Sequence, residues 1–157
     1  MNFEELMLRA VTNAETFKYT AKPNPVVGAI LCNDNEIISE GYHEIYGSNH
    51  AEINAISNAR KHQGKKFNNF SELVLVCTLE PCSHVGKTGS CAEQIVETGI
   101  KKVVIGSIDP NPKVAGKGIE ILKKTVLTSL LALMKILSKI RINTFSLSIL
   151  TTNLILF

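Results

Sequence analysis

Apolar residues recur at helical spacing along the first segment of the chain. The residues of this apolar stripe are Phe3, Leu6, Met7, Ala10, Val11, Ala14 and Phe17. One apolar stripe is typical of a helix that packs one face against a core. Asn2 with Glu5 three residues later fits an N-terminal capping pair. The AKPNP stretch at 21–25 ends this predicted helix, because proline disfavours helical geometry in the residue before it.

Four short segments predict β-strands. Residues 26–31, 73–79 and 102–108 are nearly continuous apolar runs, which are typical of buried strands. Residues 33–35 (NDN) form a turn cluster, and residues 36–41 follow it as a fourth strand. The first strand and the strand after the turn therefore form a predicted hairpin.

Three further segments predict helices. Residues 51–62 place apolar side chains on one side, and residues 91–98 begin with a capping box formed by Ser90 and Glu93. A third helix is predicted to begin near Gly118. Because strands alternate with helices, the pattern indicates an α/β fold with helices flanking a central sheet. The opening hairpin makes that sheet mixed rather than purely parallel.

Length and composition indicate one ordinary globular domain. The chain has 157 residues, of which 45% are hydrophobic and 20% are charged. Its formal net charge is +3, but five cations follow the last acidic residue, so residues 1–120 carry a net charge of −2. The cations are Lys123, Lys124, Lys135, Lys139 and Arg141. This distribution gives no basic face for a nucleic-acid backbone.

The N-terminus and the cysteines favour the cytoplasm. The opening MNFEELMLRA has two early acids and no long apolar run, unlike an export signal. No stretch before residue 121 approaches a membrane span. Four cysteines are too few for a disulfide scaffold. Cys32 and Cys77 lie inside predicted strands and are expected to be core residues.

The chemistry is concentrated in His50, Glu52, Cys82 and Cys91. One imidazole and two thiolates suit Zn²⁺, and three protein ligands leave a coordination position open for water, as in catalytic zinc sites. Glu52 lies two residues from His50 at a predicted helix start, where it can reach such a water without binding the metal. Helix N-termini favour the thiolate and neutral imidazole forms that bind metals.

Each of these residues also has a structural explanation when taken singly. His50 is explained as a hydrogen-bonded polar residue, Glu52 as a capping carboxylate, and the cysteines as small buried side chains. Together, however, H-x-E followed by P-C and a second cysteine is the signature of zinc deaminases, in which the glutamate is the general acid and base. The joint pattern therefore favours a hydrolytic zinc site.

The motifs resemble the deaminase half of the bifunctional riboflavin-biosynthesis deaminase/reductase, within the cytidine-deaminase-like superfamily. The matching segments are PNPVVGA at 23–29, GYH at 41–43, HAE at 50–52, TLEPCSHVGKTGSC at 78–91 and DPNPKVAGKG at 109–118. They cover roughly residues 1–122. Eight residues separate Cys82 from Cys91, whereas nucleobase and nucleoside deaminases usually have two. The resemblance implies a three-layer fold with a central mixed sheet flanked by helices.

The resemblance also implies an activity. The expected reaction is zinc-dependent hydrolytic deamination of diaminohydroxyphosphoribosylaminopyrimidine to the aminouracil phosphoribosylamine and ammonia, with one Zn²⁺ per chain and Glu52 moving the protons. Two alternatives stay open at this point. One is a deaminase of another nucleobase or nucleotide, and the other is an inactive zinc-binding relic of the bifunctional enzyme. Self-association is common in the superfamily, so a homo-oligomer is also compatible.

Seven further positions match residues around the substrate in that family. They are Asn24, His43, His84, Lys87, Thr88, Asp109 and Asn111. A cation and a hydroxyl at Lys87 and Thr88 suit a phosphate or ribose contact. Asp109 and Asn111 follow a predicted strand at the sheet edge where α/β folds bind ligands. Turn chemistry explains Asn24, Asp109 and Asn111 as well, and solvation in an exposed loop explains Lys87.

The tail departs from the family. Residues 1–124 are expected to form the deaminase domain, and residues 125–157 contain no Gly, Pro, Asp or Glu. A helix is predicted over 126–140 from leucines on a shared face. We interpret the tail as an out-of-frame or truncated remnant, with a membrane anchor as the weaker alternative, since 142–157 is short for a span. No reductase activity and no NADP site are expected.

Overall fold

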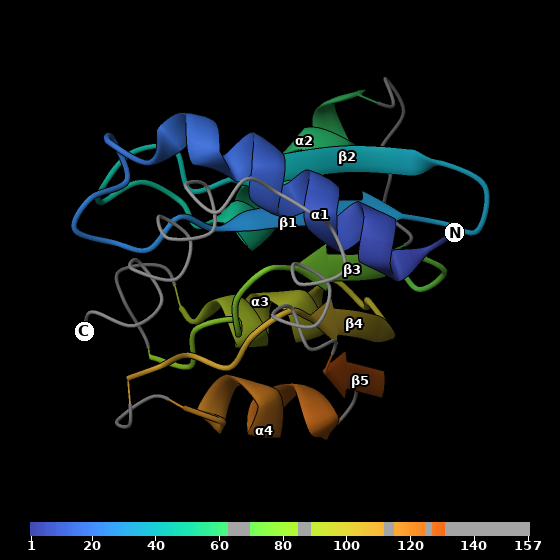
Figure 1. Ribbon diagram of the computed structural model, residues 1–157. Helices are drawn as coiled ribbons and strands as arrows, with labels where there is room; N and C mark the ends of the chain where they lie inside the picture. Colours follow the sequence, from blue (N-terminus) through green and yellow to red (C-terminus); the bar gives the residue numbers. More distant parts are fainter. Residues whose placement is uncertain (63–69, 85–88, 112–114, 125–126, 131–157) are drawn as a thin grey trace.

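A five-stranded mixed sheet organises the computed structural model of the chain, which describes residues 1–62, 70–84, 89–111, 115–124 and 127–130 (Figure 1). The strands are β1 (Gly28–Cys32), β2 (Ile37–Tyr42), β3 (Val74–Cys77), β4 (Lys102–Ile105) and β5 (Leu127–Leu130), in the order β2-β1-β3-β4-β5. β1 pairs antiparallel with both β2 and β3. β3, β4 and β5 run parallel, so the sheet is mixed, as the hairpin predicted.

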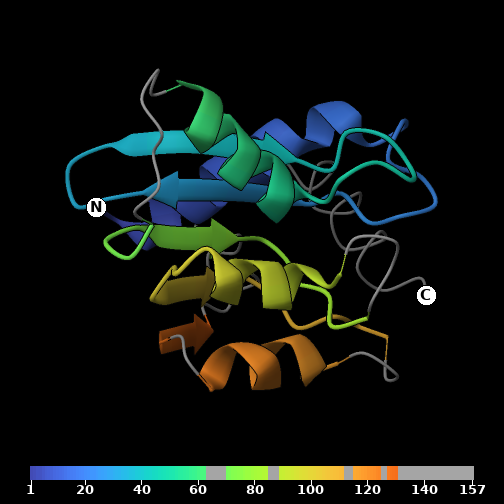
Figure 2. The same cartoon turned by 180° about the vertical axis from the view of Figure 1, so that it is seen from behind.

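Helices cover the sheet on both faces. α1 (Phe3–Ala14) is capped by Asn2, whose side chain accepts the N–H of Glu4 at 3.0 Å, and a 3₁₀ turn over Glu15–Phe17 follows it. α2 (Ala51–His62), α3 (Cys91–Glu97) and α4 (Lys117–Lys123) follow in chain order. α1 lies on one face, and the view from behind shows α2, α3 and α4 on the other (Figure 2). The chain thus has the predicted three layers.

Two apolar clusters hold these layers together. The larger one joins the sheet to α2, α3 and α4 and includes buried Leu75, Ile95 and Leu122. The smaller one joins the other face of the sheet to α1 through residues such as Met7 and Ile30. Because successive strand residues point to opposite faces, Leu31 and Cys32 belong to different clusters. Cys32 and Cys77 are buried, which confirms both as core residues.

The structure corrects one predicted element. The helix predicted over 126–140 is wrong for residues 127–130, which form β5 and pair with β4 from Lys102↔Leu127 to Ile105↔Leu130. An edge position beside a parallel strand supplies backbone hydrogen bonds that the helical spacing of leucines did not anticipate. The sheet therefore continues past residue 124. The remainder of the predicted tail, residues 131–157, lies outside the described residues. No helix in the described part of the chain is both long and apolar enough to cross a bilayer.

Candidate metal centre and substrate pocket

The start of α2 places His50 and Glu52 beside the sheet. The backbone carbonyl of His50 accepts the N–H of Asn54 at 3.0 Å, so His50 is the residue that caps the helix and Glu52 is its second residue. α2 packs closely on β2 at Gly41, where a Cβ atom would overlap the backbone of Ala51 and Ala55. The absence of a side chain at Gly41 therefore lets the first turn of α2 sit directly on the sheet.

The start of α3 brings Cys91 to Cys82. The backbone N–H of Ala92 donates to the carbonyl of Cys82 at 3.2 Å, and the N–H of Cys91 donates to Cys82 Sγ at 3.3 Å. The predicted capping box is present: Ser90 Oγ accepts the N–H of Glu93 at 3.2 Å, and the Glu93 carboxylate accepts the N–H of Ser90. Ser90 thus fixes the helix end that carries a candidate ligand.

Removing this cap should weaken the structure measurably. We expect Ser90→Ala to lower the free energy of unfolding by about 1 kcal/mol, because the N–H of Glu93 loses its hydroxyl acceptor in a buried place. Denaturant unfolding of the zinc-loaded protein measures the change. Equal unfolding free energies in the two proteins would show that the capping box contributes nothing to stability.

The three predicted ligands converge. His50, Cys82 and Cys91 each offer one ligand atom, and these atoms all lie within 4.8 Å of one another. Cys91 Sγ lies 3.3 Å from His50 Nδ1. One imidazole nitrogen and two sulfurs are the donor set that zinc prefers, and three protein ligands fit a catalytic site better than a closed structural one. In the described part of the chain, no fourth histidine, cysteine or acidic residue belongs to this group.

The thiol environment favours metal binding. The hydrogen bond from Cys91 lowers the pKa of Cys82 to about 4, against the opposing effect of burial, and the nearby His50 imidazole adds to the decrease. The same hydrogen bond, together with burial, raises the pKa of Cys91. The hydrogen bond to Cys82 raises the pKa of His50. Cys82 is therefore held as a thiolate, the form that binds metals.

Glu52 lies in an environment suited to proton transfer. Its side chain is only 3% exposed. Burial raises its pKa to about 7, although its own backbone N–H and the neighbouring His50 both act to lower it. A carboxyl group with a pKa near the working pH can both accept and return a proton.

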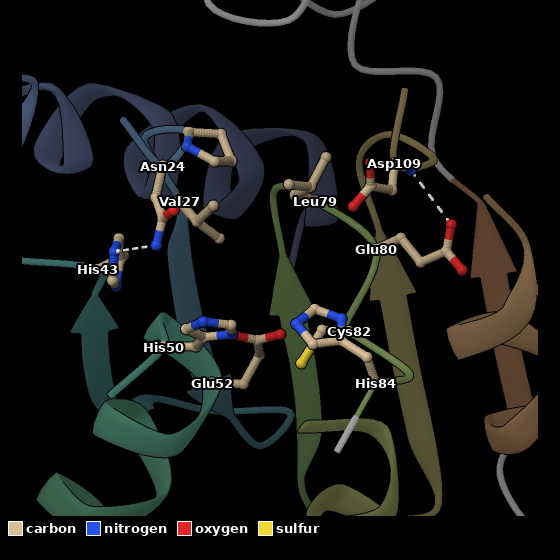
Figure 3. Close-up of a pocket in the computed structure, with 11 residues that line it drawn as sticks. Asn24, Val27, His43, His50, Glu52, Leu79, Glu80, Cys82, His84 and Asp109 are labelled. Atoms are coloured by element: carbon tan, nitrogen blue, oxygen red, sulfur yellow. Dashed lines mark hydrogen bonds between the residues drawn. The ribbon is translucent and has the colours of Figure 1, made fainter. Parts of the chain in front are cut away.

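His43 orients Asn24. His43 Nδ1 lies 3.2 Å from the backbone oxygen of Asn49, and His43 Nε2 lies 3.1 Å from Asn24 Nδ2. Because a carbonyl oxygen only accepts, Nδ1 carries the hydrogen and Nε2 accepts from the Asn24 amide. Burial lowers the pKa of His43, consistent with a neutral ring. Asn24 thereby directs one N–H to His43 and keeps its carbonyl oxygen for another partner (Figure 3).

A cavity of about 170 Å³ opens beside these groups. It is lined by the predicted residues Asn24, His43, His50, Glu52, Cys82, His84 and Asp109 (Figure 3). It is also lined by residues that the sequence did not single out, namely Pro25, Val27, Leu79 and Glu80. Asn111 is not among the residues that line this cavity; its backbone N–H donates to Asp109 Oδ1 at 2.8 Å. Lys87 and Thr88 lie outside the described residues.

A second cavity, of about 430 Å³, also adjoins the metal-ligand group. It shares Asn24, His50, Cys82 and His84 with the first. Its own lining includes Tyr46, Asn49 and Gln94, as well as the ligand Cys91. Glu52 lines the first cavity and Cys91 the second, while His50 and Cys82 line both.

The chain is similar to known proteins over most of its length. Residues 1–107 match the family described as the cytidine and deoxycytidylate deaminase zinc-binding region. The diaminohydroxyphosphoribosylamino-pyrimidine deaminase of Buchnera aphidicola subsp. Schizaphis graminum is 43% identical over 128 residues, which are 82% of this chain and 82% of that protein. The riboflavin biosynthesis protein RibD of Escherichia coli (strain K12) is 41% identical over 76% of this chain, which spans 30% of RibD.

Solved structures show the same fold. Acinetobacter baumannii RibD, form 2, superposes with a TM-score of 0.77 at 33% identity, covering 98% of this chain and 40% of that one. The dCMP deaminase from the cyanophage S-TIM5 has a TM-score of 0.52 at 22% identity, covering 81% of this chain and 97% of that one. These neighbours confirm the predicted cytidine deaminase-like fold, with a central mixed sheet between layers of helices.

Proposed function

The chain belongs to the family of the cytidine and deoxycytidylate deaminase zinc-binding region, and from this we propose that it catalyses zinc-dependent hydrolytic deamination of diaminohydroxyphosphoribosylaminopyrimidine. The observation that carries the reaction type is the convergence of one imidazole and two thiols beside a buried carboxyl group with a pKa of about 7. The similarity to the Buchnera deaminase over most of both chains supports the substrate.

His50, Cys82 and Cys91 would hold one zinc ion per chain. Zinc bound there supplies a Lewis acid that activates water at neutral pH. Glu52 takes a proton from the attacking water and gives it to the ring nitrogen while the oxygen bonds to the amino-bearing carbon. It then takes the proton of that new hydroxyl group and passes it to the amino group, so that the C–N bond breaks, a carbonyl group forms and ammonia leaves. The burial of Glu52 keeps bulk water from competing for this proton and holds the pKa of the carboxyl group close to neutrality.

Asn24 and Asp109 bind the pyrimidine in this proposal. The His43 ring fixes the Asn24 amide, so that its carbonyl oxygen accepts a hydrogen bond from an N–H group on the ring edge. Asp109 lines the same cavity and presents a carboxylate to the ring's amino groups. His84, which lines both cavities, lies where the ring and the phosphoribosyl arm meet.

The phosphoribosyl arm reaches beyond the pyrimidine ring in this proposal. Lys87 and Thr88, which lie outside the described residues, are proposed to supply the phosphate or ribose contacts. The second cavity, which shares His50, Cys82 and His84 with the first, gives such an arm room beyond the ring.

The test is a substrate comparison with the purified, zinc-loaded chain. We expect ammonia release from diaminohydroxyphosphoribosylaminopyrimidine with kcat/KM at least about a hundredfold above that for cytidine or dCMP, because polar groups matched to one ligand are left unpaired by another. Metal analysis of the same sample is expected to give one zinc per chain. Faster turnover of cytidine or dCMP would assign the site to another nucleotide, and zinc binding without turnover of any of them would indicate a relic.

A further inference from the structure

The carboxylate of Glu80 is enclosed by backbone N–H groups. Its Oε2 accepts the N–H of Asp109 at 3.2 Å and that of Gly116 at 2.9 Å, and its Oε1 accepts the N–H of Gly118 at 2.9 Å and that of Ile119 at 3.2 Å. The side chain is 5% exposed. A buried carboxylate with four N–H donors makes strong, charge-assisted hydrogen bonds. It therefore holds the backbone at Asp109 and at the start of α4.

Glu80 also lies close in sequence to the metal-ligand group. It lies between β3 and Cys82 in the sequence, and its own N–H donates to the carbonyl of Ser107 at 2.8 Å. The start of α4 packs against Pro81, the residue after Glu80. A Cβ atom at Gly118 would overlap the carbonyl oxygen of Pro81, so only glycine allows this close approach. Gly116 has a φ of 83°, a left-handed conformation that favours glycine. Asp109 and the start of α4 thus meet at one carboxylate.

One of the residues held in this way faces the proposed substrate cavity. Asp109 lines that cavity together with Glu52 and Asn24. Figure 3 shows Glu80 and Asp109 on the same side of the pocket, with the Glu80 carboxylate bonded to the backbone nitrogen of Asp109. A displacement of the Asp109 backbone would move the Asp109 carboxylate within this cavity.

We propose that Glu80 is a positioning residue for substrate binding: by holding the backbone N–H groups of Asp109 and of the start of α4, it sets the place of Asp109 in the pyrimidine pocket. The inference rests on the proposed function, because it assumes that a pyrimidine occupies this cavity. Glu80 does not touch the reacting atoms in this account. Its loss should weaken substrate binding and leave the proton transfer by Glu52 intact.

Glu80→Gln tests this role. The glutamine has nearly the same shape, but its NH₂ group faces two of the four backbone N–H donors, so half of the hydrogen bonds become repulsive. We expect KM to rise about tenfold, the equivalent of one hydrogen bond to the substrate. We expect kcat to stay within about threefold of the parent value, and the zinc content to be unchanged. Glu120→Gln, on the exposed face of α4, is the matched control and should leave KM unchanged.

A second variant covers the case in which Glu80→Gln does not fold. In Gly116→Ala the new methyl group contacts nothing, but the left-handed backbone of residue 116 becomes strained. The substitution therefore disturbs the start of α4 from outside the pocket. We expect KM to rise again, with kcat nearly constant. Unchanged KM in the folded variants of an active parent overturns this inference alone. A fall in zinc content and kcat in Glu80→Gln also overturns it. A parent chain without activity on the pyrimidine overturns the proposed function and this inference together.

Discussion

Glu52→Gln is expected to reduce kcat at least about a thousandfold without loss of zinc. General acid and base catalysis contributes about 10² to 10⁴ in rate, and Glu52 serves in both directions of the proposed proton transfer. The glutamine keeps the size of the side chain in a place that is 3% exposed, so packing is preserved and only the ability to carry a proton is removed. Ammonia release under saturating substrate measures the effect.

Stability separates this catalytic role from a structural one. Burial raises the pKa of Glu52 above that of an unfolded chain, so its ionisation costs folding free energy as the pH rises from about 4.5 to 7. Glu52→Gln should therefore be at least as stable as the parent at pH 8, whereas loss of a structural residue would lower stability. Glu36→Gln, on the exposed turn before β2, is the control. Turnover in Glu52→Gln near the parent value would remove Glu52 from its assigned role.

The sequence predicted the elements well where a local signal marks their ends. α2 has the predicted limits. α3 begins at the predicted residue, because the capping box of Ser90 and Glu93 marks the first turn of this helix. Strand limits were shifted: the apolar run at 26–31 became β1 at Gly28–Cys32. Hydrophobicity indicates which residues are buried, but the limits of a strand depend on where the neighbouring strand pairs with it. Residue 27 accepts the N–H of His43 outside the paired region.

The tail shows the limit of periodicity. Leu130 lies on a helical stripe in the sequence, yet it pairs with Ile105 in β5. The spacing of these apolar residues fits a helix when the segment is considered alone. The segment forms a strand because β4 offers it an unpaired edge. Such an edge is a property of the assembled sheet, and it is absent from any short window of sequence.

The site also contains residues that the sequence predicts and residues that it does not. His50, Glu52, Cys82 and Cys91 are recognisable from the sequence because their chemistry needs those side chains at that spacing. Glu80 and Asn49 were missed. Asn49 acts on His43 through its backbone carbonyl, which every residue possesses. Glu80 binds backbone N–H groups up to 39 positions away. The signal for Glu80 in the sequence was its position directly after the apolar run at 73–79. A charged residue so close to the core is seldom simply exposed to solvent.

Removal of zinc is the prediction that tests the metal centre itself. We expect chelation to abolish ammonia release and to lower the melting temperature by about 10 °C, since a ligand present at a thousandfold excess over its Kd stabilises the folded state by about 4 kcal/mol. Added zinc should restore both properties. The backbone N–H of Cys91 donates to Cys82 Sγ, and Cys91 Sγ lies 3.3 Å from His50 Nδ1, so a bound cation would join three groups that are already adjacent.

The four cysteines provide the matched comparison for this test. Cys91→Ala removes one of the three ligands and should lose zinc and activity together. Cys32→Ala truncates a thiol equally buried in β1 but on the opposite face of the sheet, in the cluster with α1, so it should keep the parent zinc content and turnover despite some loss of packing. If both variants lose the same fraction of zinc, the loss follows from general destabilisation. If Cys91→Ala retains both zinc and activity, the metal is held elsewhere, and the convergence of His50, Cys82 and Cys91 has another purpose.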